Sequence, residues 1–182
     1  HGVGTLDAII FRYAEVLLIR AEAGAELGKD PELDLTVNAL RKRVGFNVKL
    51  TSSPATDSKL VAKHPIIKGT NADLIREIRR ERRVELFGEG LRYADLMRWG
   101  CGERLVAPKA GMMLYTDVYT PEEIAVLKTE VGTYADGSLD VYGKRVTTPA
   151  IFESPKHYLF SLPLNEMALN PKLTPNNPGW GD

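Results

Sequence analysis

The chain has 182 residues, of which 43% are apolar and 26% are charged, values typical of a soluble globular protein of one domain. Lysine plus arginine equals aspartate plus glutamate at 24 each, and this zero net charge disfavours a protein that grips nucleic acid through its phosphates. The single cysteine, Cys101, excludes an internal disulfide framework and any metal site built from several cysteines.

The first predicted element is a helical hairpin over residues 11–45. Apolar residues of "FRYAEVLLIRAEAGAEL" recur at helical spacing, and Gly28 follows as a natural stop. Pro31 suits the first turn of a second helix, which "ELDLTVNALRKRVG" continues as far as Gly45. The pair has the size of one tetratricopeptide-type unit. Its alanines would let the two helices approach closely.

The remaining chain predicts a mainly α fold with irregular insertions. Residues 46–70 read as a loop, residues 71–99 as two helices separated by "GEG", and residues 101–156 as a variable loop region. In that region only "PEEIAVLKTE" is helical, and "SLDVYGKRV" predicts a hairpin. Residues 157–182 predict an extended tail, in which four prolines after Leu162 are expected to exclude regular structure while Leu173 and Trp180 pack against the surface.

The segment from Arg76 to Gly100 holds seven arginines and five acidic residues. Four of the glutamates recur at every fourth position, so on a helix they form an acidic stripe beside the arginines. We therefore expect most of these arginines to pair with carboxylates of the same helix, for example Arg80 with Glu77, and to build a scaffold. The residues assigned to this structural network are Glu77, Arg80, Glu81, Arg83, Glu85, Arg92, Asp95, Arg98 and Trp99.

Three blocks of the sequence resemble the SusD/RagB family. "ERRVELFGEGLRYADLMRW" is similar to its pattern E-R-R-x-E-L-x-x-E-G-x-R-x-x-D-L-x-R-W. "RYAEVLLIRAEAGAELG" with "ALRKRVGF" resembles its tetratricopeptide-like hairpin, and "YLFSLPLNEMALNPKLTPNNPGW" resembles its C-terminal signature. The blocks stand in the family order and cover about half of the chain. Among the departures, Phe87 and Gly88 stand where the family often has Ala-Phe, and Leu91 where it often has histidine.

The resemblance implies a non-catalytic glycan-binding protein on the cell surface of Bacteroidetes. Such a protein delivers oligosaccharides to a SusC-like TonB-dependent transporter and is held at the outer membrane by an N-terminal lipid anchor that lies outside this chain. Because family members usually run to several hundred residues, we expect residues 1–182 to be the C-terminal part of one. Two alternatives remain open: a peptide-binding member of the same family, and a cytosolic tetratricopeptide-like adaptor, which predicts several repeats rather than one hairpin.

Motifs for catalysis are missing from the sequence. His1, His64 and His157 lack the spacing of metal ligands, and neither a phosphate-binding loop nor a serine nucleophile motif occurs. Arginines near the glutamates would lower the glutamate pKa values, which does not suit a carboxyl group acting as a general acid. We predict no enzyme activity, no cofactor, no metal and no nucleic-acid partner.

Four tyrosines of the variable region are the candidate ligand-binding residues: Tyr115, Tyr119, Tyr134 and Tyr142. Aromatic faces can stack on sugar rings, and loops on a helical scaffold commonly carry binding residues. The alternative for each is simple coverage of the helices. A second polar group, on residues 92–99, is either a ligand platform or a packed structural element. Packing is favoured because Leu96 and Met97 precede Trp99.

Overall fold

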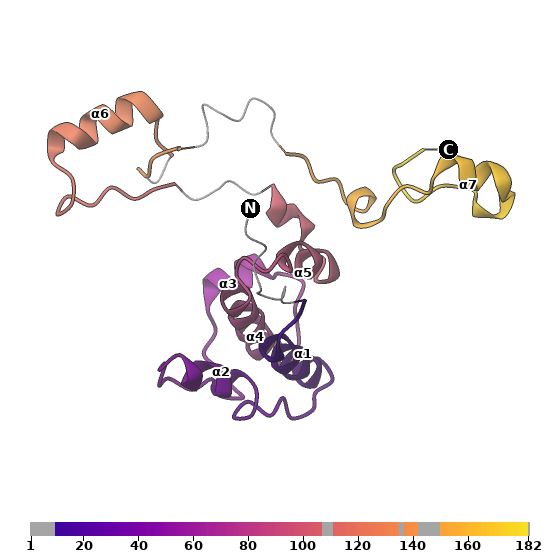
Figure 1. Cartoon of the computed structure of the whole chain (residues 1–182), viewed down its shortest axis with the longest axis horizontal. Coiled ribbons are helices and arrows are strands. Elements are labelled where there is room, and N and C mark those ends of the chain that lie inside the picture. The colour runs from indigo at the N-terminus through magenta and orange to yellow at the C-terminus, as the bar shows by residue number, and fades with distance from the viewer. Residues whose placement is uncertain (1–9, 107–110, 135–136, 142–149, 182) are drawn as a thin grey trace, which may run out of the picture. The chain divides into compact units, whose positions relative to one another are not determined.

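The computed structural model describes residues 10–106, 111–134, 137–141 and 150–181. The chain divides into two compact units, residues 1–101 and residues 102–182. Seven α-helices occur in the described ranges (Figure 1), so the predicted mainly helical fold is confirmed. The β-structure of these ranges consists of two isolated bridges, which join Leu139 to Met112 and to Thr133.

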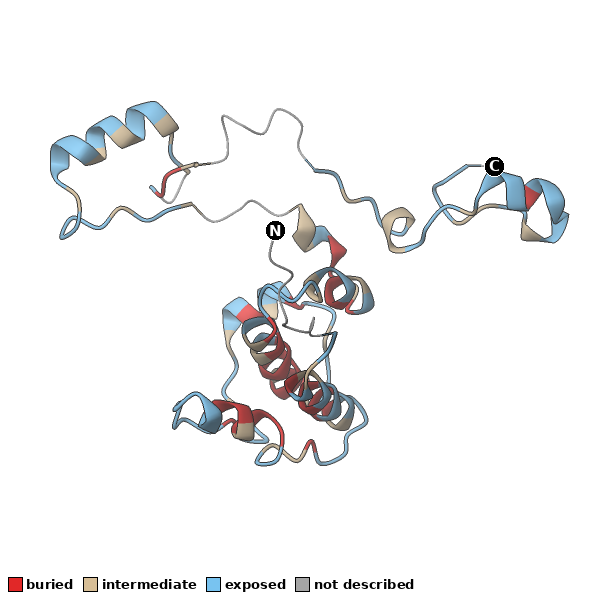
Figure 2. Ribbon diagram, viewed as in Figure 1, coloured by how far each residue is buried: buried red, intermediate tan, exposed pale blue. Residues whose placement is uncertain are grey.

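The core of the first unit lies between α1 (Tyr13–Glu26) and α4 (Ala72–Glu85), which pack along each other. Figure 2 shows the buried faces of both helices. Leu18 and Ile78 are fully buried at this contact. Small buried side chains on α1 permit the close approach: Ala14, Ala21 and Ala25. Beyond α1 the chain turns at Gly28, whose φ of 65° suits a residue without Cβ.

The second helix of the hairpin is α2 (Val37–Arg43), and α1 contacts it less extensively than it contacts α4. The prediction that Pro31 opens this helix is wrong. Pro31 precedes a turn and lies so close to α1 that a Cβ added at Gly24 would stand 2.9 Å from the Pro31 Cα atom. Gly24 therefore permits the chain to fold back on α1 at this point.

The segment 46–70 is not wholly a loop, because α3 (Ser58–Lys63) forms within it. The helix is capped by Asp57, whose carboxylate accepts hydrogen bonds from the backbone N–H groups of Lys59 and Leu60. Upstream, the Asn38 side chain both donates to and accepts from the backbone of Leu50, at 3.0 and 2.8 Å. These two hydrogen bonds fix the loop along α2.

The first unit ends with α5 (Arg92–Arg98), which follows α4 after the predicted break at 88–90. Gly88 and Gly90 both adopt positive φ, at 82° and 78°, so this tight connection depends on residues without Cβ. The connection turns α5 back toward α1 and α4. It thereby brings carboxylates and guanidinium groups from three helices together.

The second unit contains α6 (Pro121–Val131) and α7 (Leu164–Leu169). A capping box of Thr120 and Glu123 starts α6. The prediction that prolines exclude regular structure from the tail is wrong, because α7 begins directly after Pro163. Short 3₁₀ turns also occur at Lys156–Tyr158 and Pro171–Leu173, and another at Gly102–Leu105 opens this unit.

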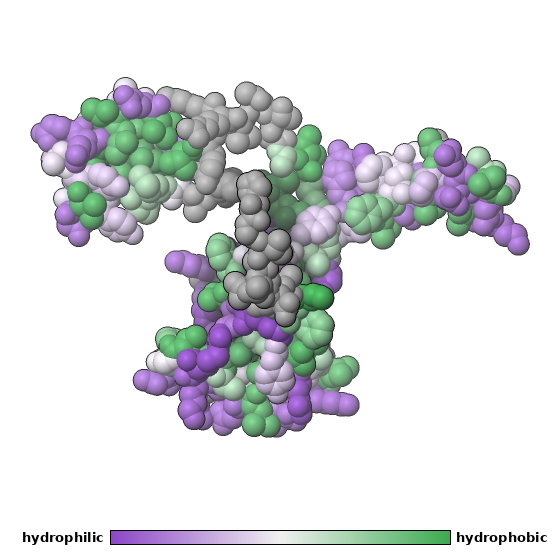
Figure 3. All heavy atoms as spheres, viewed as in Figure 1, coloured by the Kyte–Doolittle hydropathy of each residue, from purple (hydrophilic) through white to green (hydrophobic). Residues whose placement is uncertain are grey.

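The tail folds back on itself through Trp180. Its indole N–H donates to the carbonyl oxygens of Lys156 and Leu159, at 3.1 and 2.8 Å. The predicted hairpin "SLDVYGKRV" falls mostly outside the described residues. Figure 3 shows hydrophobic residues mixed with hydrophilic ones on the surface around α6. The exposed apolar side chains there include Met112, Met113, Val118 and Val126.

Candidate functional site

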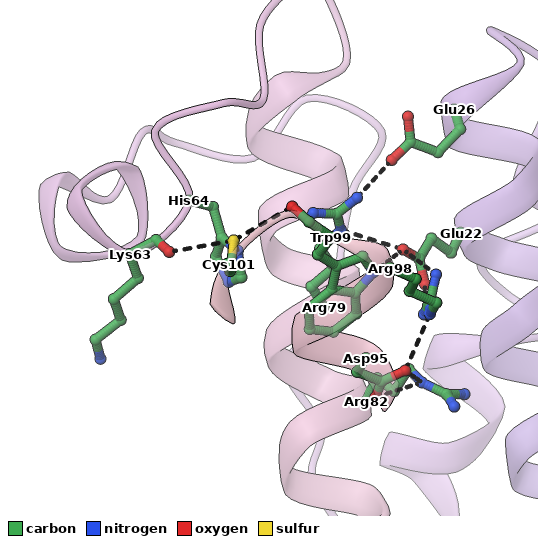
Figure 4. Close-up of polar contacts among 10 residues, drawn as sticks. All are labelled: Glu22, Glu26, Lys63, His64, Arg79, Arg82, Asp95, Arg98, Trp99 and Cys101. Atoms are coloured by element: carbon green, nitrogen blue, oxygen red, sulfur yellow. Dashed lines mark hydrogen bonds and ion pairs between the residues drawn. The ribbon is translucent and has the colours of Figure 1, made fainter. Parts of the chain in front are cut away.

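A buried carboxylate on α1 is the centre of a polar network between α1, α4 and α5. Glu22 is only 4% exposed. It accepts hydrogen bonds from Arg79 Nε at 3.1 Å, from Arg98 Nη1 and Nη2 at 3.0 and 2.6 Å, and from Trp99 Nε1 at 2.6 Å (Figure 4). One carboxylate from α1 therefore joins a side chain of α4 to the end of α5.

Trp99 is surrounded by guanidinium groups. The Arg79 and Arg98 guanidinium carbons lie 4.6 and 4.8 Å from the centre of its ring, and that of Arg92 lies 5.4 Å away. The His64 ring meets the indole edge-on, with centroids 5.6 Å apart. Because cations are attracted to the aromatic face, this buried tryptophan adds cation–π attraction to the ion pairs.

A second buried carboxylate, Asp95, joins α4 to α5. Arg82 Nε donates to both Asp95 oxygens, at 2.9 and 2.8 Å, and Arg98 Nε donates at 3.1 Å. Arg82 also reaches Glu15 of α1 through Nη2, at 3.4 Å. Arg82 and Asp95 side chains are each 5% exposed, so this pair is largely removed from water.

Most of the arginine partners lie on other helices, which corrects the expectation of pairing within one helix. Pairs at i, i+3 do occur, as between Arg80 and Glu77 and between Arg98 and Asp95. Further ion pairs join Arg41 to Glu81, Arg79 to Glu26, and both Arg12 and Arg43 to Glu85. Within the described part of the chain, the exposed Arg83 forms no ion pair.

The network sets the protonation of Glu22. Burial raises the pKa of Glu22, but the hydrogen bonds and charge of Arg98, the charge of Arg79 and the Trp99 N–H together outweigh burial and hold this pKa below its ordinary value. Since the folded pKa is depressed, the ionised carboxylate stabilises the fold above the ordinary glutamate pKa of about 4.3. That stabilisation is lost as the pH falls through the folded pKa.

Glu77 has the opposite behaviour. Burial raises its pKa, and the charges of Arg80 and Arg41 do not fully compensate. The folded chain therefore keeps a proton on Glu77 at a pH where the unfolded chain has lost it. The contribution of Glu77 to stability falls as the pH rises from about 4.3 through the folded pKa.

The substitution Glu77→Gln is accordingly expected to raise the free energy of unfolding at pH 7 and to leave it almost unchanged at pH 3, where glutamate is neutral in both states. Urea unfolding at the two pH values measures both quantities. The matched variant Glu22→Gln should do the reverse and lose stability at pH 7. The change that Glu77→Gln causes in the free energy of unfolding is compared at the two pH values. A change that is less favourable at pH 7 than at pH 3 would contradict this assignment.

The candidate ligand tyrosines lie in the second unit. Tyr115 is 62% exposed and begins a turn in which its carbonyl accepts the N–H of Tyr119, at 3.0 Å. Tyr134 is half-buried and packs over Gly111, where an added Cβ would stand 2.8 Å from the tyrosine ring. Tyr142 lies outside the described residues. Tyr115 is therefore the most accessible of the three described aromatic faces.

A pocket at the connection of α4 and α5 was not anticipated from the sequence. It has a volume of about 480 Å³ and is lined by side chains that include Arg82, Arg83 and Phe87. The Phe87 side chain is 87% exposed.

The two described histidines, His64 and His157, contact other groups of the protein. Buried His64 places Nδ1 3.6 Å from the Cys101 sulfur, and His157 Nδ1 accepts the Glu153 N–H at 2.8 Å. In the ranges that the structure describes, no group of three histidine, cysteine, aspartate or glutamate side chains has the arrangement of a metal site. None of the helices in those ranges is both long and apolar enough to cross a membrane.

The first unit is thus a helical scaffold held by buried arginine–carboxylate pairs, and the second unit exposes Tyr115 at the start of a turn. The chain belongs to the SusD family, whose family model matches residues 2–180. It is 31% identical over 112 residues to a SusD-like protein, P38, of Formosa agariphila. That match covers 61% of this chain and 20% of the relative, so the aligned part spans about a fifth of the relative's length. No solved structure matches the chain.

Proposed function

We propose that the chain is part of a non-catalytic cell-surface protein that binds oligosaccharides and delivers them to a SusC-like TonB-dependent transporter in the outer membrane. Membership of the SusD family over nearly the whole chain is the observation that carries this proposal. Proteins of this family are nutrient-binding proteins, generally without catalytic activity and attached to the outer membrane through lipid.

The internal pairing of the arginines supports a binding scaffold. Glu22 and Asp95 neutralise the guanidinium groups of Arg79, Arg82 and Arg98 inside the first unit. The helices are thereby fixed by side chains inside the first unit, and ligand contacts fall to exposed loops and turns. Tyr115 is our candidate for a face that stacks on a sugar ring.

The substitution Tyr115→Ala is expected to weaken binding of a neutral oligosaccharide by about twofold to tenfold, because one aromatic contact is worth about 0.5–1.5 kcal/mol. Isothermal titration of the 182-residue chain against a panel of oligosaccharides and peptides measures this. Tyr93→Ala is the matched control, because Tyr93 is a similarly exposed tyrosine, at 51%, on α5.

Two results would count against the proposal. Equal affinities for the Tyr115 and Tyr93 variants would remove Tyr115 from the ligand site. Binding of peptides but of no oligosaccharide would replace glycan capture by the peptide-binding alternative within the same family.

A further inference from the structure

The pocket between the end of α4 and the start of α5 carries an unusual local charge. Three arginines line it, Arg82, Arg83 and Arg92, against one carboxylate, Asp95. Asp95 is already engaged by Arg82 and Arg98. In a chain whose overall formal charge is zero, the lining of this pocket therefore holds more arginines than carboxylates.

One of the lining side chains, Arg82, has a donor without an acceptor among the described residues. Arg82 Nη1 is buried and has no hydrogen-bond partner among the described residues, while Nε and Nη2 of the same guanidinium bond Asp95 and Glu15. Buried polar groups are almost always hydrogen-bonded, so an unsatisfied N–H on a buried cation indicates a missing acceptor. An anionic oxygen is the acceptor that guanidinium groups bind most strongly.

The walls of the pocket suit a sugar ring. Phe87 exposes an aromatic face at 87%. Gly88 and Gly90 leave open space, since an added Cβ at either would meet nothing within 4 Å. A volume of about 480 Å³ admits a single sugar residue with its ring substituents.

We propose that this pocket binds the carboxylate of an acidic sugar residue, such as a uronate within a glycan. The carboxylate accepts from Arg82 Nη1 and from the exposed Arg83, and the sugar ring packs against Phe87. This inference rests on the proposed glycan-binding function and names a ligand class for it. The residues that line this site belong to the first unit, whereas the candidate tyrosines belong to the second.

The test is an amide NMR titration of the ¹⁵N-labelled 182-residue chain with D-glucuronate and, separately, with D-glucose. Glucuronate is expected to shift the signals of Gly88 and Gly90, and glucose at the same concentration is not. The substitution Arg83→Gln is expected to raise the dissociation constant for glucuronate by about threefold or more, because it removes one charge-assisted hydrogen bond. Arg83 forms no ion pair in the described ranges, so this variant keeps the network intact.

Lys42→Gln is the charge-matched control, because Lys42 is an exposed cation on α2 away from the pocket lining. Identical shifts with glucose and glucuronate, or an unchanged affinity in Arg83→Gln, would overturn the proposal. If acetate binds as tightly as glucuronate, the proposed contact of the sugar ring with Phe87 is overturned. If neutral oligosaccharides bind and lose affinity in Tyr115→Ala while glucuronate leaves Gly88 and Gly90 unshifted, the inference fails and the proposed function stands.

Discussion

Replacing Glu22 by alanine is expected to lower the free energy of unfolding by about 3–5 kcal/mol, since removing one partner from a buried ion pair leaves an uncompensated charge. The side chain accepts four hydrogen bonds from Arg79, Arg98 and Trp99. Of these donors, the Arg79 side chain is only 9% exposed and cannot recover full hydration without local opening. Urea unfolding followed by circular dichroism at pH 7 measures the loss.

Glu26→Ala provides the matched control on the same helix. Glu26 also pairs with Arg79, but its side chain is 45% exposed. A partly exposed pair of this kind is worth about 0–1 kcal/mol, so this variant is expected to remain close to the parent in stability. Equal losses for the two variants would show that burial of Glu22 adds nothing to the fold.

Replacing Asp95 by asparagine is expected to cost about 3 kcal/mol in the same assay. The change conserves shape but removes the negative charge that faces Arg82 Nε and Arg98 Nε. It can also place an amide N–H opposite donors that need an acceptor. The remaining contact of Arg82 with Glu15, at 3.4 Å, is too long to compensate.

The control for Asp95 is Asp34→Asn, because the Asp34 side chain is 70% exposed and pairs with the equally exposed Lys49. Its expected cost is much smaller than that of Asp95→Asn, because ion pairs between exposed side chains contribute little to stability. High salt should reduce the small Asp34 effect further while leaving the Asp95 effect largely intact, because buried pairs are screened far less than exposed ones. An Asp95→Asn variant as stable as Asp34→Asn would contradict the role of Asp95 as the link between α4 and α5.

The positions of the long helices followed from local sequence signals. The periodic apolar residues of α1 and α4 and the glycines at 28 and 88 mark elements whose stability depends on one buried face. Two short helices, α3 and α7, were not predicted from such signals. The cap of α3, Asp57, stands among loop-forming residues, which hides the helix in the sequence. Pro163 resembles a helix breaker in the sequence, although proline is compatible with the start of a helix such as α7.

The arginine partners were the less predictable part of the network. Helical spacing identifies neighbours on one helix, as for Arg80 and Glu77, but it cannot show that Arg79 reaches Glu22, 57 residues earlier. Such pairs depend on how α1, α4 and α5 pack. The pocket beside Phe87 was missed for the same reason, since its lining arises from a turn between two helices. Tyr115, Tyr119, Tyr134 and Tyr142 stay predictions as ligand residues.

The measurement that most directly tests internal neutralisation of the arginines is a double-mutant cycle between Glu22 and Arg79. The single variants Glu22→Ala and Arg79→Ala and the double variant are unfolded in urea at pH 7, and their coupling energy is calculated. Internal pairing predicts a favourable coupling of about 1–3 kcal/mol, because the double variant no longer buries an unmatched charge. A coupling indistinguishable from zero would mean that the two side chains act independently and that the arginines of α4 do not hold this fold together.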